Sequence, residues 1–349
     1  MMQTTPRLLS LATAVPPYEV GREDAIRLAH RVFGGRSSHL EHLMPVFTNS
    51  GIEKRYSCVP PPWYERAHSW SERNRLFIAN ALTLMERATL DCLKQAGLGV
   101  ENIDAIVAVS TSGIVTPSLD AQLLNRIGLR PDVQRLPVFG LGCAGGALGL
   151  GRAAALAKAQ PTANVLLVVV ECCGLTFRAS DCSNSNIIAT ALFGDGAAAA
   201  LLSCTGEGPA VTAWGEHTWP DSLDVMGWRV EDDGLGVVFS ASIPALVRRD
   251  FRHALDAFLA RHDLSLPDIR SFLLHPGGPK VLAALEDALE LRNGTLDHER
   301  IILRDYGNMS AATVLFVLHR GLKEMVPGRS LVAAMGPGFT AGFVVLEAS

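Results

Sequence analysis

Three residues of this chain carry side chains that could together catalyse an acyl transfer, and each stands beside glycines that indicate a turn. Cys143 lies in Gly140-Leu-Gly-Cys-Ala-Gly-Gly146, between an apolar run and an alanine-rich stretch. His275 follows Leu-Leu and precedes Pro-Gly-Gly, and Asn308 lies in Tyr306-Gly-Asn-Met-Ser310. A thiol can form an acyl-enzyme, while an imidazole and a carboxamide can supply a proton acceptor and hydrogen-bond donors.

The turn that holds Cys143 predicts a nucleophile. The free N–H groups and aligned peptide dipoles at a helix N-terminus favour an anion, so we expect a lowered pKa and a thiolate. The small residues 144–147 leave room for a bulky acyl group and for close approach of another backbone segment. The alternative is that Cys143 is a core cysteine packed inside a Gly- and Ala-rich helix.

His275 and Asn308 complement a cysteine nucleophile. The imidazole of His275 would hold Cys143 as a thiolate and, when charged, donate a hydrogen bond. The carboxamide of Asn308 is a neutral donor that does not compete for protons. Two donors that converge on one point form an oxyanion hole for a thioester carbonyl as it becomes an enolate or a tetrahedral adduct. The alternatives are a packed or surface histidine and a helix-capping asparagine.

The elements that must position these residues alternate between strands and helices. Short apolar runs predict strands at residues 5–12, 105–109, 164–170, 194–202, 272–274 and 331–334. Apolar positions at helical spacing predict helices at residues 77–96, 118–127, 242–259, 279–291 and 312–324. This alternation predicts an α/β protein in which helices cover parallel or mixed sheets.

The two halves of the chain repeat one order of elements. Each half runs helix, strand, helix, glycine-bearing turn, helix, strand, and each turn lies at a similar distance from the strand that follows. We therefore expect two duplicated units: residues 1–215, which carry Cys143, and residues 216–349, which carry His275 and Asn308. Cys143 and Asn308 would then lie at equivalent turns.

Composition narrows the function classes. Of the 349 residues, 48% are hydrophobic and 19% are charged, as in a compact enzyme, and the net charge of −4 disfavours nucleic acid as a partner. The seven cysteines are irregularly spaced, without a zinc-type pattern, which predicts a reduced protein with no metal site. The N-terminus lacks a signal-peptide pattern, and the apolar runs are too short to span a membrane. We expect a cytoplasmic protein.

The sequence resembles the type III polyketide synthases, which include the chalcone and stilbene synthases of the thiolase superfamily. The resemblance covers the whole chain in the family's order and spacing. It rests on Gly142-Cys-Ala-Gly-Gly146, Phe193-Gly-Asp-Gly-Ala197, His275-Pro-Gly-Gly278, Gly307-Asn-Met-Ser310 and Gly336-Pro-Gly338. It implies a thiolase-like fold of two duplicated α/β/α halves, with mixed sheets layered between helices, and a homodimer.

The resemblance also implies the chemistry. Cys143 would carry the starter acyl group and the growing polyketide, and His275 would keep it ionised. His275 and Asn308 would steady the oxygen of the malonyl thioester as CO2 leaves. The substrates would be an acyl-CoA starter and malonyl-CoA, and no other cofactor is implied.

Several cavity residues follow from the same resemblance. Phe193 looks like the gatekeeper aromatic between the coenzyme A tunnel and the cavity. Val237 stands near the place of a second gatekeeper Phe, which predicts a wider mouth, and Met335 stands where the family's glycine-rich loop has Phe. Thr116 replaces a Met that crosses the dimer interface in plant enzymes.

The remaining wall residues suggest the starter. Cys173 replaces a cavity-wall Thr, whereas Thr111 and Thr176 keep the family's residue type. Smaller or unbranched wall residues resemble those of bacterial members that accept fatty acyl starters. We therefore expect a medium- or long-chain starter and alkylpyrone or alkylresorcinol products. The tetrahydroxynaphthalene-forming branch often has an extra Cys near Ser112, and its absence here argues mildly against that product.

Coenzyme A is anionic, so basic residues should line the tunnel mouth. Lys54 and Arg55 are the candidates, against the alternative of a solvated charged face, and we also assign Ser310 to coenzyme A binding. Three other functions stay open. They are a single-condensation ketoacyl synthase III-like enzyme served by an acyl carrier protein, a type III synthase with an aromatic or malonyl starter, and a non-catalytic thiolase-fold subunit.

Overall fold

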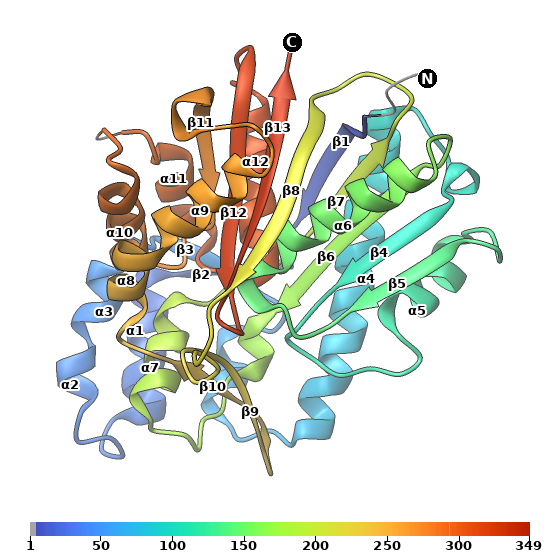
Figure 1. Ribbon diagram of the computed structural model, residues 1–349. Helices are drawn as coiled ribbons and strands as arrows, with labels where there is room; N and C mark the ends of the chain where they lie inside the picture. Colours follow the sequence, from blue (N-terminus) through green and yellow to red (C-terminus); the bar gives the residue numbers. More distant parts are fainter. Residues whose placement is uncertain (1–4, 293) are drawn as a thin grey trace.

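A nine-stranded mixed sheet runs through the computed structural model, which describes residues 5–292 and 294–349 (Figure 1). The strand order is β11-β12-β13-β8-β1-β7-β6-β4-β5. The strands are β1 (Arg7–Ala14), β4 (Ala105–Val109), β5 (Gln134–Val138), β6 (Val165–Cys172), β7 (Asp195–Ser203), β8 (Ala210–Thr218), β11 (Ile269–Leu274), β12 (Gly328–Gly336) and β13 (Thr340–Ala348). β4 pairs in parallel with β5 and β6, β11 pairs in parallel with β12, and the other pairs are antiparallel. The predicted α/β class with mixed pairing is confirmed.

The sheet has a weak joint between its two halves. β1 and β8 pair only through Arg7 and Ala210, whereas β8 pairs with β13 along most of its length. The N-terminal strands therefore form one group and the C-terminal strands another, as a duplicated arrangement requires. The predicted boundary between residues 215 and 216 falls inside β8, and the division into two duplicated units stays a prediction.

Helices cover both faces of the sheet. α4 (Trp70–Ala96) packs on one face of β1, β6 and β7, while α6 (Gly145–Ala159) and α12 (Thr313–Leu322) pack on the other. A third apolar cluster joins α9 (Arg252–Ala260) and α10 (Pro279–Leu289) to β11, β12 and β13. The remaining helices are α1 (Arg22–Phe33), α2 (Leu40–Leu43), α3 (Pro45–Asn49), α5 (Leu119–Ile127), α7 (Asn184–Leu192), α8 (Ile243–Leu246) and α11 (Asp297–Tyr306).

Most predicted elements are present, with shifted ends. The helix predicted at residues 77–96 begins earlier, at Trp70, because the Ser69 side chain accepts a hydrogen bond from Glu72 N–H and caps it. The helix predicted at residues 242–259 contains a π-helical stretch, Val247–Phe251, between α8 and α9. Among the strands of the main sheet and the longer helices, the prediction missed β8, β13, α1, α7 and α11.

Two small antiparallel ribbons lie outside the main sheet. One joins β2 (Tyr18–Gly21) to β3 (Lys54–Ser57), and the other joins β9 (Met226–Glu231) to β10 (Gly234–Phe239). Figure 1 shows β9 and β10 near α7, beyond the lower end of the sheet. Both ribbons supply residues to the pocket described below.

Two kinds of feature are missing from residues 5–292 and 294–349. No helix in these ranges is both long and apolar enough to cross a membrane. No group of three or more His, Cys, Asp and Glu side chains in the same ranges could hold a metal ion.

Candidate active site

Cys143 lies in a tight turn that leads into a buried helix. The 3-10 helix η3 (Gly142–Ala144) holds the cysteine and continues directly into α6. Gly142 has φ +46, and a Cβ there would lie 2.5 Å from the Cδ of Pro337, so the turn requires glycine. The Gly142 N–H donates a hydrogen bond of 3.1 Å to Thr111 Oγ1, which anchors the turn to the end of β4. The thiol is therefore held on rigid backbone.

The glycines after Cys143 allow a second turn to approach. A Cβ on Gly146 would overlap the carbonyl oxygen of Ala311, and one on Gly145 would lie 3.0 Å from the Cβ of Ala311. Ala311 belongs to the 3-10 helix η7 (Ser310–Ala312), which leads into α12. The predicted close backbone approach is confirmed. The predicted room for an acyl group at these glycines is wrong, because protein atoms occupy it.

Asn308 is oriented from both its backbone and its side chain. Its N–H donates to Leu192 C=O at 2.8 Å, and its C=O accepts from Gly194 N–H at 2.9 Å. Its Oδ1 accepts from Ser310 N–H at 2.8 Å, and its Nδ2 donates to Gly277 C=O at 3.2 Å. These bonds fix the carboxamide between the turn of Cys143 and the loop that follows His275.

His275 leaves the C-terminal end of β11. Its backbone N–H donates to Ala333 C=O at 2.8 Å, on β12. The side chain is buried, and neither ring nitrogen has a hydrogen-bond partner in the described part of the chain. Burial lowers the pKa of His275 to about 4, so the imidazole is neutral at neutral pH and free to accept a proton.

The prediction of a resting thiolate is wrong in direction. Burial raises the pKa of the Cys143 thiol to about 12, and the negative charge of Glu171 adds to the rise. Hydrogen bonds from the Ser310 and Asn308 side chains oppose it without cancelling it. Burial thus disfavours the charged form of both side chains and opposes the effect of the helix N-terminus on the thiol.

Sequence reasoning missed Glu171, a buried carboxyl behind the nucleophile. Its Oε2 accepts hydrogen bonds from Thr111 N–H at 3.1 Å, Ser112 N–H at 3.0 Å and Ser112 Oγ at 2.6 Å. Burial raises its pKa to about 7. The signal was present, because Glu171 is the one charged residue in the otherwise apolar run of residues 165–172. Thr111 thus connects Glu171 to the Cys143 turn.

Four of the predicted cavity residues share one pocket, whose empty space is about 600 Å³ with its open mouth included. They are Phe193, Cys173, Thr176 and Val237. The Phe193 ring packs edge-on against Trp228, with centroids 6.3 Å apart. The Phe193 backbone forms a bridge with Asn308, so the pocket begins next to the polar centre.

Two predicted cavity residues lie elsewhere. Thr111 is buried behind the Cys143 turn and does not line this pocket. Met335 is buried in β12 and packs in the core with Phe339 and Ala341. The side chain of Met335 fills the interior between the sheet and α9, so its replacement of Phe does not widen this pocket.

The three predicted coenzyme A residues do not gather at one place. Lys54 is exposed and pairs with Glu19 at 3.0 Å. Arg55 is buried; its Nη1 donates to Ala191 C=O at 2.6 Å, and burial lowers its pKa to about 10. Neighbouring strand residues point to opposite faces, which explains why Lys54 and Arg55 diverge. Ser310, at φ +48, lies against Cys143 rather than at an open mouth.

Comparisons with known proteins show the family of this chain. The family model for the N-terminal domain of chalcone and stilbene synthases matches residues 7–206, and the model for the C-terminal domain matches residues 212–348. A Streptomyces peucetius protein named 1,3,6,8-tetrahydroxynaphthalene synthase is 40% identical over 96% of this chain and 91% of its own length. A Bacillus subtilis (strain 168) protein with a provisional chalcone synthase name is 39% identical over 97% of this chain and 98% of its own length.

Solved structures agree in fold. The crystal structure of 1,3,6,8-tetrahydroxynaphthalene synthase from Streptomyces coelicolor A3(2), a bacterial type III polyketide synthase, superposes with a TM-score of 0.93 at 28% identity and covers 98% of this chain and 99% of that one. The type III domain of Steely1 from Dictyostelium has a TM-score of 0.91 at 26% identity, covering 98% and 99%. The predicted thiolase-like fold is confirmed. The chain belongs to the chalcone and stilbene synthase family and is a type III polyketide synthase, an acyltransferase that condenses acyl units with loss of CO2.

Proposed function

We propose that this synthase extends a medium- or long-chain fatty acyl starter with malonyl-CoA and releases alkylpyrones or alkylresorcinols. The observation that supports the starter is the pocket that begins at Phe193, beside Asn308, and reaches Val20 and Leu28. Its exposed lining is mainly apolar, which suits an alkyl chain. Val237 contributes a small side chain to the wall where an aromatic ring would narrow it.

The loading step uses Cys143 and His275. The Cys143 sulfur attacks the carbonyl carbon of the acyl-CoA thioester while the neutral His275 imidazole takes the thiol proton. The bond to the coenzyme A sulfur then breaks, and that sulfur leaves as a thiol with the proton from His275. The His275 imidazole is neutral when it takes the thiol proton, and it returns that proton to the leaving sulfur.

The condensation step uses Asn308 together with His275. The bond between the malonyl carboxylate and the α-carbon breaks, and CO2 leaves. The electron pair of the broken bond stays on the α-carbon and forms the enolate of the thioester. The Asn308 amide and the His275 N–H stabilise the enolate oxygen. The apolar face of Phe193 keeps water from the carboxylate and disfavours its charge. The enolate carbon then attacks the acyl group on Cys143, whose sulfur leaves as the new C–C bond forms.

Product analysis by mass spectrometry tests this proposal. The protein receives malonyl-CoA with starters from acetyl- to stearoyl-CoA and with aromatic CoA esters, and Cys143→Ala serves as the control. We expect pyrones or resorcinols that carry the alkyl chain of the starter and that vanish in Cys143→Ala. Turnover of aromatic starters alone would contradict the fatty acyl proposal.

A second candidate is a malonyl starter, because one relative at 40% identity is named 1,3,6,8-tetrahydroxynaphthalene synthase. That activity would give an aromatic product from malonyl-CoA alone, with no other starter in the assay. A product seen only with an acyl carrier protein, and extended once, would instead indicate a ketoacyl synthase III-like reaction. The same assay separates the three outcomes.

We also propose that the protein is a homodimer joined at β5, the last strand of the sheet. Leu136 in β5 and the neighbouring Phe139 and Ile114 are exposed, and Phe139 and Ile114 also line an apolar pocket. An exposed group of large apolar side chains at the edge of the sheet favours contact with a second copy. Sedimentation of the wild type should give a dimer, and Phe139→Glu should shift it to a monomer; a monomeric wild type would contradict the proposal.

A further inference from the structure

One wall of the acyl pocket does not belong to the main sheet. Leu235 and Val237 of β10 line this wall, and within the described residues the β9–β10 ribbon forms backbone ladders only with itself. On the neighbouring wall lie Ala189 and Thr190 of α7. The separation of these two walls therefore depends on side-chain contacts rather than on a shared sheet.

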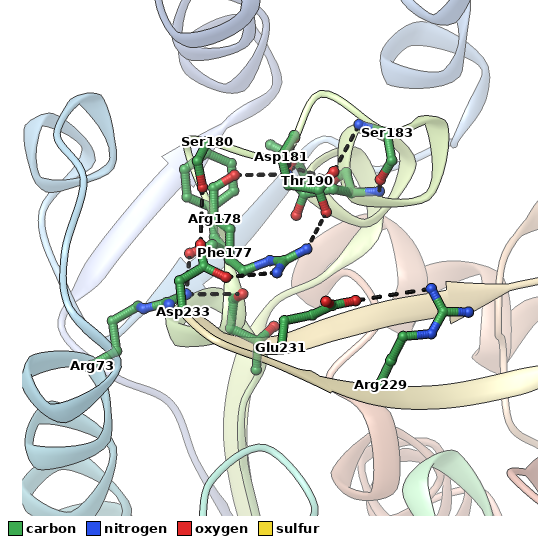
Figure 2. A network of polar contacts seen from close by, with 12 residues as sticks. Arg73, Phe177, Arg178, Ser180, Asp181, Ser183, Thr190, Arg229, Glu231 and Asp233 are labelled. Atoms are coloured by element: carbon green, nitrogen blue, oxygen red, sulfur yellow. Dashed lines mark hydrogen bonds and ion pairs between the residues drawn. The ribbon is translucent and has the colours of Figure 1, made fainter.

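Arg178 makes the polar contact between the two walls (Figure 2). Its Nη1 lies 2.7 Å from Asp233 Oδ1, at the turn of the β9–β10 ribbon. Its Nη2 lies 2.6 Å from Asp181 Oδ2, in the loop before α7. The Arg178 side chain is only 11% exposed and Asp181 is 18% exposed, whereas Asp233 is 44% exposed, so solvent screens the pair with Asp181 less than the pair with Asp233. Ser180 Oγ adds a hydrogen bond of 2.9 Å to Asp233 Oδ2.

The loop that carries Arg178 is attached to α7. Asn186 Nδ2, in the first turns of that helix, donates to Arg178 C=O at 2.9 Å and to Asp181 C=O at 2.7 Å. Asn186 itself lines the pocket. A shift of the Arg178 loop would therefore also shift Asn186, on the pocket side of α7.

The turn of the ribbon is also seated on a buried arginine of α4. Arg73 Nη1 donates to Phe177 C=O at 2.8 Å, and a Cβ on Gly234 would lie 2.7 Å from Arg73 Nη2. Gly234, at φ +141, follows Asp233 and precedes the wall residue Leu235. Asp233 thus meets the positive charges of both Arg178 and Arg73. A change at Asp233 would act directly on the start of β10.

We propose that the Arg178–Asp233 ion pair is a clamp that sets the separation of β10 and α7 and thereby limits the length of the acyl chain that the pocket accepts. Arg178 and Asp233 are positioning residues, because neither lines the pocket. The proposal rests on the proposed function, which places the alkyl chain in this pocket. Opening the clamp lets the β10 wall move and favours longer acyl groups.

Acyl loading of Cys143 isolates this effect from chain extension. Wild type, Asp233→Asn and Arg178→Lys are mixed, without malonyl-CoA, with equal amounts of octanoyl-, tetradecanoyl- and stearoyl-CoA, and the adducts are weighed by intact-protein mass spectrometry. Asp233→Asn keeps the shape and removes the charge, whereas Arg178→Lys keeps the charge and loses the two-pronged geometry. We expect the stearoyl-to-octanoyl ratio to rise about tenfold in both variants, the scale at which pockets discriminate alkyl chains.

A matched control lies on the same ribbon. Arg229 pairs with Glu231 at 3.9 Å, and its side chain is 72% exposed. Arg229→Gln removes one ion pair of the ribbon without touching the clamp, so we expect its adduct ratio to equal that of the wild type. Hydrogen exchange of residues 226–239 provides a second measurement and should quicken in Asp233→Asn but not in Arg229→Gln.

The outcomes separate the two proposals. Faster exchange together with a shift to longer adducts supports the clamp, and the double variant Arg178→Lys/Asp233→Asn should then shift no further than either single variant. An unchanged adduct ratio in variants whose ribbon does exchange faster overturns it. A wild type that loads fatty acyl groups but makes no extended product contradicts the proposed function and leaves the clamp result standing.

Discussion

The reaction centre and the acyl pocket lie side by side, but the structure holds them in different ways. Cys143, His275 and Asn308 sit on turns at the ends of buried strands and helices, and backbone hydrogen bonds and glycine contacts fix those turns. The pocket wall at β10 is a separate ribbon held by the charged side chains of Arg178 and Asp233.

This difference teaches which part of the enzyme tolerates change. Displacing a turn of the reaction centre requires breaking the packing of α6 against η7. Such a change would affect the reaction of every substrate. The β10 wall shares no strand ladder with the main sheet, and side-chain contacts hold it, among them the Arg178–Asp233 ion pair. We therefore expect changes at the turns to affect every substrate and changes at the β10 wall to affect the choice among acyl chains.

The largest effect should come from Asn308→Ala. It removes a donor that is aimed at the developing enolate oxygen, and loss of one such donor lowers kcat about a hundredfold to a thousandfold. Loading of Cys143 by the starter should persist, so single-turnover mass spectrometry should show an acyl-enzyme that accumulates. Asn125→Ala, at an exposed position on α5, is the control. Normal condensation by Asn308→Ala would remove Asn308 from the mechanism.

Gly146→Ala should break the reaction centre through packing. The new Cβ would overlap the carbonyl oxygen of Ala311 and push η7 away from Cys143. We expect a loss of about 2 kcal/mol in the free energy of unfolding, measured by urea denaturation, with a matching loss of turnover. Gly21→Ala is the control, because its Cβ would meet only Asp24 Oδ2, at 3.5 Å. Equal stability of the two variants would refute the packing argument.

Glu299, a buried carboxyl beside the reaction centre, should lower the free energy of unfolding at alkaline pH. Glu299 accepts a hydrogen bond of 2.6 Å from Leu274 N–H, next to His275, and burial raises its pKa from 4.5 to about 8. The folded chain thus keeps a proton that the unfolded chain releases. The stabilisation is complete below pH 4.5 and is lost as the pH rises through about 8.

Urea unfolding between pH 5 and pH 9 measures this loss, which we expect to be about 2 kcal/mol or more in the wild type. Glu171, whose pKa burial raises to about 7, adds a loss of the same sign. The side chain of Gln in Glu299→Gln cannot ionise. The free energy of unfolding of this variant should therefore depend less on pH, by the amount that Glu299 contributes. Parallel curves for the wild type and Glu299→Gln would show that Glu299 does not titrate in this range.

The smallest effect should come from Val237→Phe, which changes the pocket wall and leaves the reaction centre alone. A ring at this position fills part of the pocket and should lower the stearoyl-to-octanoyl loading ratio about tenfold. Val238→Phe, on the opposite face of β10, is the matched control. Similar ratios in the two variants would mean that the alkyl chain does not pass Val237.

The reaction centre could be predicted from sequence because its signals are local. Continuous apolar runs such as residues 165–170 mark buried strands, and the glycines beside Cys143, His275 and Asn308 mark turns. The observed ends of these elements differ from the predicted ends, and the prediction missed β8 and β13. The strand β13 was hidden because its run begins directly after the glycine-rich loop, which favoured a loop interpretation.

The pocket wall could not be predicted in the same way. Arg73, Arg178 and Asp233 are far apart in the sequence and meet only when α4, the loop before α7 and the β9–β10 ribbon are folded together. The family resemblance placed Met335 in the cavity. Arg55 was assigned to the tunnel mouth because it is one of two adjacent basic residues. Met335 is buried in the core and Arg55 is buried in the lining of the pocket, and both placements depend on which face of each strand turns inward.

The sequence by itself indicated the fold class, because apolar periodicity and turn glycines act over a few residues, and its motifs indicated the family and the three candidate catalytic residues. Only the tertiary structure decided the ionisation of those residues. Burial by distant segments raises the pKa of Cys143 and lowers that of His275, and hydration, unlike residue type, is a property of the folded chain. The same long-range packing decided how the acyl pocket is closed.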